Sequence, residues 1–276
     1  ATHQGATDPG VFFSAPSGRE GPAHVNRVQL PGLVDVHVHL RHPGGEHKET
    51  IESGTAAALA GGVVAVLAMP NTSPPIVDGM RLATSRKEHA RRALCDVGLY
   101  VGAGAGSARS SAACAEHAAG LKVYVDETFG PLRLEHLDQV AAHFAAWPRG
   151  KPIVVHAEDL SVAAAIGLAA AHGQRVHVAH VSRSAEMELI VAAKEAGLPV
   201  TCEVSPHHLF LTDADAAALG PYGLVRPALG SAQDRDALWR HLDAVDCVAS
   251  DHAPHLRQEK DGASPPPGTA VRLSAM

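Results

Sequence analysis

The stretch Leu33-Val-Asp-Val-His-Val-His-Leu40 is the first of a series of short β-branched runs that decide the fold. Each run has the length and composition of a buried strand, and Ala-rich stretches of helical character lie between them. The predicted strands are Leu33–Leu40, Val63–Ala68, Asp96–Val101, Leu121–Val125, Pro152–His156, Val176–Val181, Pro199–Val204 and Asp246–Ser250. The predicted helices are Ser53–Ala60, Met80–Ala93, Ser107–Ala119, Leu134–Trp147, Leu160–His172, Ser184–Ala196 and Asp234–Leu242. This α/β alternation implies parallel strands and favours a TIM-type (β/α)8 barrel, with a doubly wound open sheet as the alternative.

The sequence after the eighth predicted strand is short for a complete barrel. A polar, proline-rich stretch follows Asp251, and only Thr269–Met276 remain beyond it. Such a segment is too short for the helix that normally covers the eighth strand. We therefore predict that residues 30–276 form a barrel without its final helix. We also predict that this chain alone is poorly soluble or weakly active. Residues 1–29, rich in Gly, Pro and Ser, are predicted to be poorly ordered or to join a small side sheet.

The composition agrees with a globular enzyme, since 46% of the residues are apolar and 19% are charged. The formal charge of −6, without a stretch dense in Lys or Arg, argues against nucleic acid as a partner. The most apolar stretch, 55–69, is shorter than the ~20 residues that a bilayer span needs. The four cysteines form no CxxC pair, which is typical of reduced thiols. We therefore expect a cytoplasmic protein that binds neither nucleic acid nor membrane.

Histidine is unusually common, with 19 residues, and two of them lie near the end of the first predicted strand. Alternate side chains of a strand share a face, so His37 and His39 are predicted to point together into the barrel. The simplest alternative is that they are only polar residues finishing a strand. Imidazole is the commonest metal ligand in proteins, so the pair also suggests a metal site.

Four further strands carry residues of related chemistry. Lys122 lies inside the fourth strand. The fifth strand ends at His156, the sixth ends near His180, and Asp251 directly follows the eighth. In a barrel the carboxyl ends of all strands meet at one face, where active sites are built. An unpaired buried ammonium would be costly, whereas a carbamate made from Lys122 and CO₂ is an anion that can bridge two metal ions. We therefore predict a two-zinc hydrolase in which Asp251 transfers the proton.

The remaining histidines are interpreted as structural. His177, three residues before His180, is expected on the opposite strand face. The histidines in helical stretches are expected at the surface; these are His89, His117, His136, His143, His172 and His241. Three positions near the seventh strand stay open. His207 and His208 lie near the mouth of the site, and Glu203 is a candidate for an extra metal ligand or a supporting contact.

Several longer motifs resemble dihydroorotases of the amidohydrolase superfamily. They are Leu30–Arg41 (LPGLVDVHVHLR), Pro43–Gly45 (PGG), Ala68–Thr72 (AMPNT), Glu127–Phe129 (ETF) and Ala249–His255 (ASDHAPH). The resemblance covers roughly residues 28–268. Within the family, the motifs most specifically resemble the dihydroorotase domain of CAD-type multifunctional proteins. It implies reversible cyclisation of N-carbamoyl-L-aspartate to L-dihydroorotate in pyrimidine (UMP) biosynthesis. It also implies fusion to carbamoyl-phosphate synthetase and aspartate transcarbamoylase domains, and a homo-oligomer.

The resemblance also implies residue roles. One zinc ion would be held by His37, His39, Lys122 and Asp251. The second would be held by Lys122 as the carbamate, His156 and His180. The substrate would contact Arg41, Asn71, Thr128, Phe129, Arg226, His255, Pro267 and Gly268, with Thr128 and Phe129 in a mobile loop. An arginine beside the metals makes chemical sense, because guanidinium binds carboxylates through two hydrogen bonds.

Two departures from the family pattern stand out. His42 replaces a glutamate next to Arg41, and Ala179 replaces the cysteine proposed to help Glu203 bind a third zinc in CAD-type domains. A third metal is therefore not expected. The metal ligands alone also allow another cyclic amidohydrolase, of the dihydropyrimidinase or allantoinase type, or a catalytically silent assembly module. Arg41 favours a substrate that bears a carboxylate.

Overall fold

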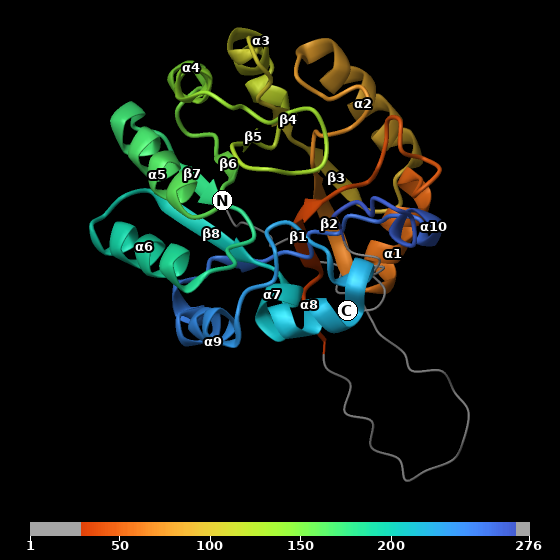
Figure 1. Ribbon diagram of the computed structural model, residues 1–276. Helices are drawn as coiled ribbons and strands as arrows, with labels where there is room; N and C mark the ends of the chain where they lie inside the picture. The colour runs from red at the N-terminus through yellow and green to blue at the C-terminus, as the bar shows by residue number, and fades with distance from the viewer. Residues whose placement is uncertain (1–28, 269–276) are drawn as a thin grey trace.

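The computed structural model describes residues 29–268, and its strands form one parallel series (Figure 1). The segments 1–28 and 269–276, which include most of the predicted N-terminal segment and the last residues of the chain, lie outside the described residues. The strands are β1 (Leu33–Val38), β2 (Val63–Ala68), β3 (Asp96–Leu99), β4 (Val101–Gly102), β5 (Leu121–Tyr124), β6 (Ile153–His156), β7 (Val176–Val178), β8 (Val200–Val204) and β9 (Cys247–Val248). Hydrogen bonds join them in the orders β1-β2-β3 and β4-β5-β6-β7-β8-β9, and every pairing is parallel.

Backbone contacts at two points turn these two sheets into a closed barrel. Tyr100 separates β3 from β4, yet its N–H donates to Ala68 O at 3.0 Å, so the two short strands act as one barrel strand. At the other junction His39 N donates to His252 O at 2.7 Å, and Val38 forms a parallel bridge with His252. The first strand therefore pairs with the last, which confirms the (β/α)8 prediction and excludes the open sheet.

The predicted helices form the outer ring (Figure 1). They are α1 (Ile51–Ala60), α2 (Gly79–Arg92), α3 (Ala108–Ala113), α4 (Leu137–Ala146), α5 (Leu160–His172), α6 (Ser184–Glu195) and α9 (Ala232–Arg240). In α5 the buried residues Val162, Ala165, Ile166 and Ala169 follow the three-and-four spacing of a single helix face. This face packs against the outer side of the strands in the main hydrophobic core. Side chains at the N-cap start α2 and α9, where Asp78 and Ser231 accept backbone N–H bonds.

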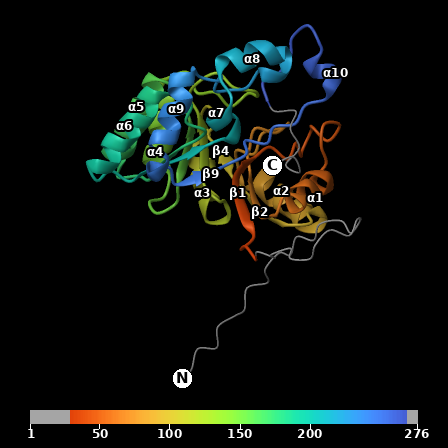
Figure 2. The same ribbon diagram turned by 90° about the horizontal axis from the view of Figure 1, so that it is seen from below.

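The sequence interpretation missed or misplaced several elements. Two helices follow β8, namely α7 (Pro206–Phe210) and α8 (Asp213–Leu219), and α10 (Arg257–Lys260) interrupts the polar stretch after β9. The predicted helix 107–119 is only α3 followed by the 3-10 turn η1 (Ala115–His117); further 3-10 turns are η2 (Gly220–Gly223) and η3 (Leu242–Ala244). The helix predicted from Leu134 begins at Leu137 because Leu134 N donates to Tyr124 O in extended backbone. Figure 2 shows α8 and α10 lying at the same end of the barrel.

The strands at the junction between β9 and β1 have partly exposed apolar side chains. Val248 of β9 is 49% exposed, and Leu33 and Val34 of β1 are each 56% exposed. Asp35 strengthens this junction from inside by accepting from His37 N at 3.1 Å and from Ser250 N at 3.2 Å.

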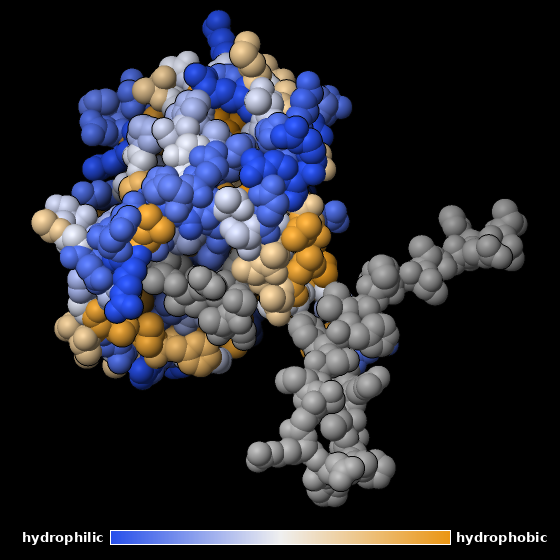
Figure 3. Space-filling model, turned by 90° about the vertical axis from the view of Figure 1, so that its right-hand side faces the viewer, coloured by the Kyte–Doolittle hydropathy of each residue, from blue (hydrophilic) through white to orange (hydrophobic). Residues whose placement is uncertain are grey.

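Elsewhere, the face that carries α1, α2 and α10 is mostly hydrophilic, with separate apolar areas (Figure 3). Within residues 29–268, no helix is long and apolar enough to cross a membrane.

Candidate active site

Left-handed backbone at three strand ends turns side chains toward the barrel axis. Arg41, His180 and Asp251 have positive φ angles of 48°, 35° and 47°, a conformation that non-glycine residues adopt rarely and at an energetic cost. At His180 the effect changes the expected strand alternation. His180 and His177 both point into the barrel, so the expectation that His177 faces outward is wrong: His177 Nε2 lies 3.0 Å from Glu203 Oε2.

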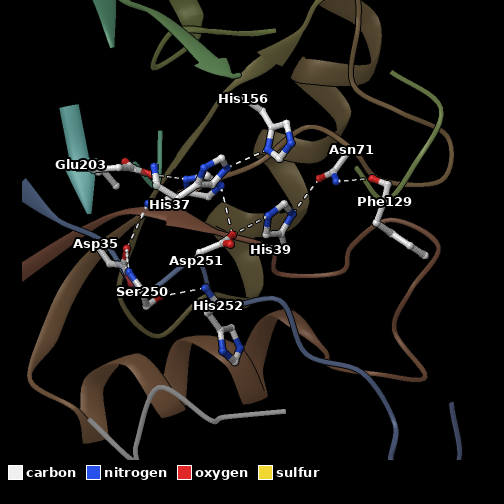
Figure 4. A network of polar contacts seen from close by, with 12 residues as sticks. Asp35, His37, His39, Asn71, Phe129, His156, Glu203, Ser250, Asp251 and His252 are labelled. Atoms are coloured by element: carbon white, nitrogen blue, oxygen red, sulfur yellow. Dashed lines mark hydrogen bonds and ion pairs between the residues drawn. The ribbon is translucent and has the colours of Figure 1, made fainter. Parts of the chain in front are cut away.

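His37, His39 and Asp251 converge at the carboxyl end of the barrel (Figure 4). Asp251 Oδ1 lies 3.3 Å from the Nε2 atoms of both histidines. Each of the three residues offers one ligand atom, and these three atoms all lie within 4.8 Å of one another. Neutral imidazoles and a carboxylate at this separation can hold a zinc ion.

Two other side chains fix the orientation of these histidines (Figure 4). Glu203 Oε1 forms a very short contact with His37 Nδ1, and Asn71 Oδ1 lies 2.8 Å from His39 Nδ1. Each contact places the ring proton on Nδ1 and leaves Nε2 as a lone-pair donor facing Asp251. Metal-binding histidines are generally held in this way by a carboxylate or a carbonyl oxygen.

Lys122 lies beneath this group, completely buried, and its Nζ has no hydrogen-bond partner within the described residues. His156 and His180 are also buried, with Nδ1 of one 2.8 Å from Nε2 of the other. His156 Nε2 and His180 Nδ1 likewise have no hydrogen-bond partner among the described residues, and Glu158 Oε1 lies 3.7 Å from His156 Nε2. Burying such atoms costs free energy unless another group binds them. This donor set fits metal ions bridged by a carboxylated Lys122.

The electrostatics of the site favour uncharged nitrogen ligands. Burial lowers the pKa of His39 to about 4, and burial together with Lys122 lowers the pKa of His156 to about 3. Burial also lowers the pKa of Lys122 to about 8, against the opposing effects of Glu203 and Asp251. Burial would raise the pKa of Asp251, but His37 and His39 hold it below its usual range. Near neutral pH His39 and His156 are therefore neutral imidazoles, Asp251 is a carboxylate, and the neutral amine of Lys122 is accessible.

Most residues predicted to contact metal or substrate line one pocket. They are His37, His39, Arg41, Asn71, Thr128, Phe129, His156, His180, Arg226, Asp251, Pro267 and Gly268. Lys122 and Glu203 lie deeper, while His255 lies behind Arg41, with its Nε2 3.0 Å from Arg41 Nη2. Arg226 is more peripheral and lies 3.7 Å from Glu127. The arrangement joins a group of metal-binding donors to an arginine and an asparagine at one opening.

A second cavity, of about 420 Å³, lies beside this pocket and shares His39, Arg41, Asn71 and Phe129 with it. Its wall also contains Lys48, a residue that the sequence interpretation missed. Lys48 belongs to the loop before α1, and neither strand periodicity nor a motif pointed to it. Tyr124 was missed too, although it lies two residues after Lys122, on the same strand face, and lines the first pocket.

Other histidines differ from expectation. His89 and His143 are buried rather than at the surface, because His89 Nδ1 bonds to Ser85 O and His143 Nε2 bonds to Gly104 O. His207 and His208 do not line the two pockets, and His208 Nε2 bonds to Pro227 O at 3.1 Å.

One more group of donor atoms lies deeper in the barrel, formed by His177, Glu203 and Cys247, with atoms within 4.8 Å of one another. Glu203 is already bound there by His37, His177 and the backbone N–H of His180, so its charge is satisfied without a metal ion.

Known proteins resemble this chain in sequence and in fold. The family model described as "Dihydro-orotase-like" matches residues 26–130. The chain is 50% identical to the multifunctional protein CAD of Squalus acanthias over 242 residues, which are 87% of this chain and 11% of that protein. These similarities identify a dihydroorotase-like domain in this chain. This dihydroorotase-like domain spans about a tenth of the length of that relative.

Solved structures share the fold. The L-hydantoinase (dihydropyrimidinase) of Arthrobacter aurescens is 25% identical, with a TM-score of 0.82, over 88% of this chain and 63% of that one. The inactive dihydroorotase-like domain of a CAD-like protein from Chaetomium thermophilum is 28% identical, with a TM-score of 0.72, over 89% of this chain and 71% of that one. The fold is therefore that of an amidohydrolase barrel, and the chain covers 63% and 71% of these two solved chains.

Proposed function

We propose that this dihydroorotase-like domain is a zinc-dependent dihydroorotase, which interconverts N-carbamoyl-L-aspartate and L-dihydroorotate. The observation that carries the proposal is the fully buried Lys122 amine, which has no hydrogen-bond partner among the described residues and interacts electrostatically with His156, His180 and Asp251. A structural lysine in this position would be destabilising. A carbamate at Lys122 instead supplies the negative charge that two zinc ions require.

The residues divide between two proposed metal positions. His37, His39 and Asp251 would hold one zinc ion, His156 and His180 the other, and Lys122 as the carbamate would bridge both. When bound, the zinc ions would activate a water molecule and polarise the carbonyl of the substrate. A third zinc is not proposed, because Ala179 offers no ligand and Glu203 is bound by three protein donors.

The protein's own groups would guide the proton. Asp251 lies at the centre of the site, and its lowered pKa keeps it ionised and able to accept a proton from the attacking water. In the hydrolytic direction the water oxygen bonds to the ring carbonyl carbon, the C–N bond breaks, and Asp251 returns the proton to the departing nitrogen. Glu203 and Asn71 hold the two histidines in place during these steps.

The substrate side of the site favours a carboxylate. Arg41 is buried in the same pocket as the proposed metal-binding side chains. Its guanidinium is held by the hydrogen bond from Nε to Pro254 O at 2.9 Å. We propose that Arg41, Asn71 and His255 bind the carboxylate, with Arg226 and the backbone of Pro267 and Gly268 near the ring. Thr128 and Phe129 would close over it; Asn71 Nδ2 already donates to Phe129 O at 2.9 Å.

A second candidate is a cyclic amidohydrolase of the dihydropyrimidinase or allantoinase type, and the similarity to L-hydantoinase favours it. A third reading, a catalytically silent module, is favoured by the similarity to an inactive domain. Loss of a metal ligand would be the expected sign of the silent form. All six proposed ligand positions in this chain carry suitable side chains.

The wider setting is proposed from the multifunctional relatives. The domain would work in a cytoplasmic homo-oligomer, in one polypeptide with carbamoyl-phosphate synthetase and aspartate transcarbamoylase domains. Its role would be in pyrimidine biosynthesis.

The test combines zinc content with dihydroorotate hydrolysis in the wild type and in Lys122→Ala. Lys151→Ala is the matched control, since Lys151 lies away from the site and donates to backbone carbonyls of Glu116 and Ala118. We expect about two zinc ions per chain and turnover in the wild type and control, and loss of both in Lys122→Ala. Zinc-free protein with full activity would contradict the proposal. Zinc-loaded protein that opens only dihydrouracil would indicate the second candidate, and one that opens neither ring would indicate the silent module.

A further inference from the structure

His255 lies between two cationic side chains. Its imidazole is completely buried, with Nε2 3.0 Å from Arg41 Nη2 and Nδ1 3.0 Å from Lys48 Nζ. Lys48 Nζ also lies 3.1 Å from Glu259 Oε1, so it donates as an ammonium paired with a carboxylate. Glu259 Oε2 lies 3.6 Å from the same Nδ1 atom, beyond hydrogen-bond distance, so the two atoms at hydrogen-bond distance from the ring both belong to donors.

A neutral imidazole can accept only one hydrogen bond, because its other nitrogen carries the proton. Burial, reinforced by Arg41 and Lys48, lowers the pKa of His255 to about 3, so the ring is neutral. If Nδ1 accepts from Lys48, the ring proton lies on Nε2 and faces the N–H of Arg41. If Nδ1 carries the proton instead, it faces the ammonium of Lys48.

The first arrangement is the favourable one. The two contacts of the ring have the same length of 3.0 Å, but the ion pair with Glu259 keeps the Lys48 ammonium at Nδ1, whereas Arg41 is already held by the bond from its Nε to Pro254 O. The Nε2–H of His255 and the Nη2–H of Arg41 then form a pair of adjacent donors. Two adjacent N–H groups are best satisfied by an anionic oxygen that accepts from both.

We propose that Lys48 is a positioning residue that sets the Nε2–H form of His255, so that His255 and Arg41 together select a substrate bearing a carboxylate. This inference rests on the proposed function, since it concerns the same substrate. Lys48 acts through His255 and also contacts the loop over the site, because its Nζ lies 4.9 Å from the centre of the Phe129 ring.

The role predicts a specific change when Lys48 is replaced. In Lys48→Met the ring of His255 is free to place its proton on Nδ1, and Nε2 then accepts from Arg41. The Nε2–H donor of His255 is then lost, and one N–H group of Arg41 is occupied by the hydrogen bond to His255. Binding of a carboxylate weakens, whereas a neutral ring such as dihydrouracil does not depend on this pair.

The experiment measures two properties of Lys48→Met, Lys48→Arg and the control Lys194→Met. Lys194 also pairs with a carboxylate, 2.5 Å from Asp246, but lies outside both pockets. The first property is the position of the His255 ring proton, read from ¹⁵N–¹H NMR. We expect Nε2–H in the wild type, Lys48→Arg and the control, and Nδ1–H in Lys48→Met.

The second property is the steady-state kinetics with dihydroorotate and with dihydrouracil. We expect Lys48→Met to raise the KM for dihydroorotate by about 10-fold or more, which matches loss of a charge-assisted bond, with unchanged kcat and zinc content. The kinetics with dihydrouracil should not change, and Lys48→Arg should restore most of the loss.

Several outcomes would overturn the inference. These are an Nδ1–H ring in the wild type, an unchanged ring in Lys48→Met, or an equal rise in KM for both substrates. The wild-type spectrum decides the first point even if Lys48→Met does not fold. If wild-type protein with an Nε2–H ring does not turn over dihydroorotate, the proposed function fails while the assignment of Lys48 to His255 stands.

Discussion

The floor and the rim of the pocket are built differently. The floor consists of His37, His39, Lys122, His156, His180 and Asp251, and the rim consists of Arg41, Lys48, Asn71, Phe129 and His255. Floor residues belong to strands or to the residues just beyond them, and their nitrogen atoms surround one carboxylate. Rim residues come mostly from loops, and two of them, Arg41 and Lys48, carry positive charge. Under the proposed function, the floor determines the reaction and the rim determines which molecule undergoes it.

The largest expected effect is on the floor. Asp251→Asn removes the group that accepts and returns the proton, so kcat for dihydroorotate should fall by about 10²- to 10⁴-fold. Asp236→Asn, which changes an exposed carboxylate beside Arg235, is the control and should leave kcat unchanged. A kcat for Asp251→Asn within a few-fold of the wild type would show that another residue moves the proton.

The second largest effect is expected at Glu203, which contacts the floor residue His37. Glu203→Gln weakens the contact that orients His37, and zinc affinity should fall by about 10- to 100-fold. Glu186→Gln is a matched control, because Glu186 is an equally buried carboxylate that accepts backbone N–H bonds outside the site. Competition for zinc with a chelator gives the affinity. Equal losses in both variants would mean that Glu203 acts only on overall stability.

A rim variant should change substrate binding without changing chemistry. Arg41→Lys keeps the charge but loses the planar pair of donors, so the KM for dihydroorotate should rise by about 10-fold while kcat stays near wild type. Arg92→Lys, which alters an ion pair with Glu52 on α1, is the control. Steady-state kinetics check this prediction, and a loss confined to kcat would remove the distinction between floor and rim.

The smallest effect is expected at the loop over the rim. Phe129→Leu removes the aromatic face near Arg41 and Lys48, whose charged atoms lie 5.5 and 4.9 Å from the ring centre. Cation–π contacts at such partly exposed sites are weak, so the KM should rise only about two- to five-fold. Phe210→Leu at an exposed position should have no effect. An effect as large as that of Arg41→Lys would place Phe129 among the main binding residues.

Sequence reasoning worked best where regular structure carries the residues. Strand alternation predicted that His37 and His39 share a face, and the alternation of strands and helices predicted the barrel, because both follow from fixed periodicities. It failed for His177, since the left-handed backbone at His180 breaks the alternation and cannot be read from composition. His89 and His143 were misplaced because buried helix positions tolerate a histidine that bonds to a backbone carbonyl.

The rim was much less predictable. Arg41 and Asn71 were expected only through the resemblance to dihydroorotases, and Lys48 was not expected. Lys48 meets His255 across 207 positions in sequence, and both lie in irregular segments whose path depends on the folded barrel. Contacts of this kind have no local sequence signal, because tertiary packing alone creates them.

The most direct test of the account is the ratio of kcat/KM for dihydroorotate to that for dihydrouracil, measured with the zinc-loaded protein. Both rings present the same amide to the floor, and only dihydroorotate presents a carboxylate to Arg41 and His255. The account predicts a preference for dihydroorotate of at least about 100-fold, because donors built for a carboxylate are left unpaired by a ring that lacks one. Equal rates, or a preference for dihydrouracil, would contradict it.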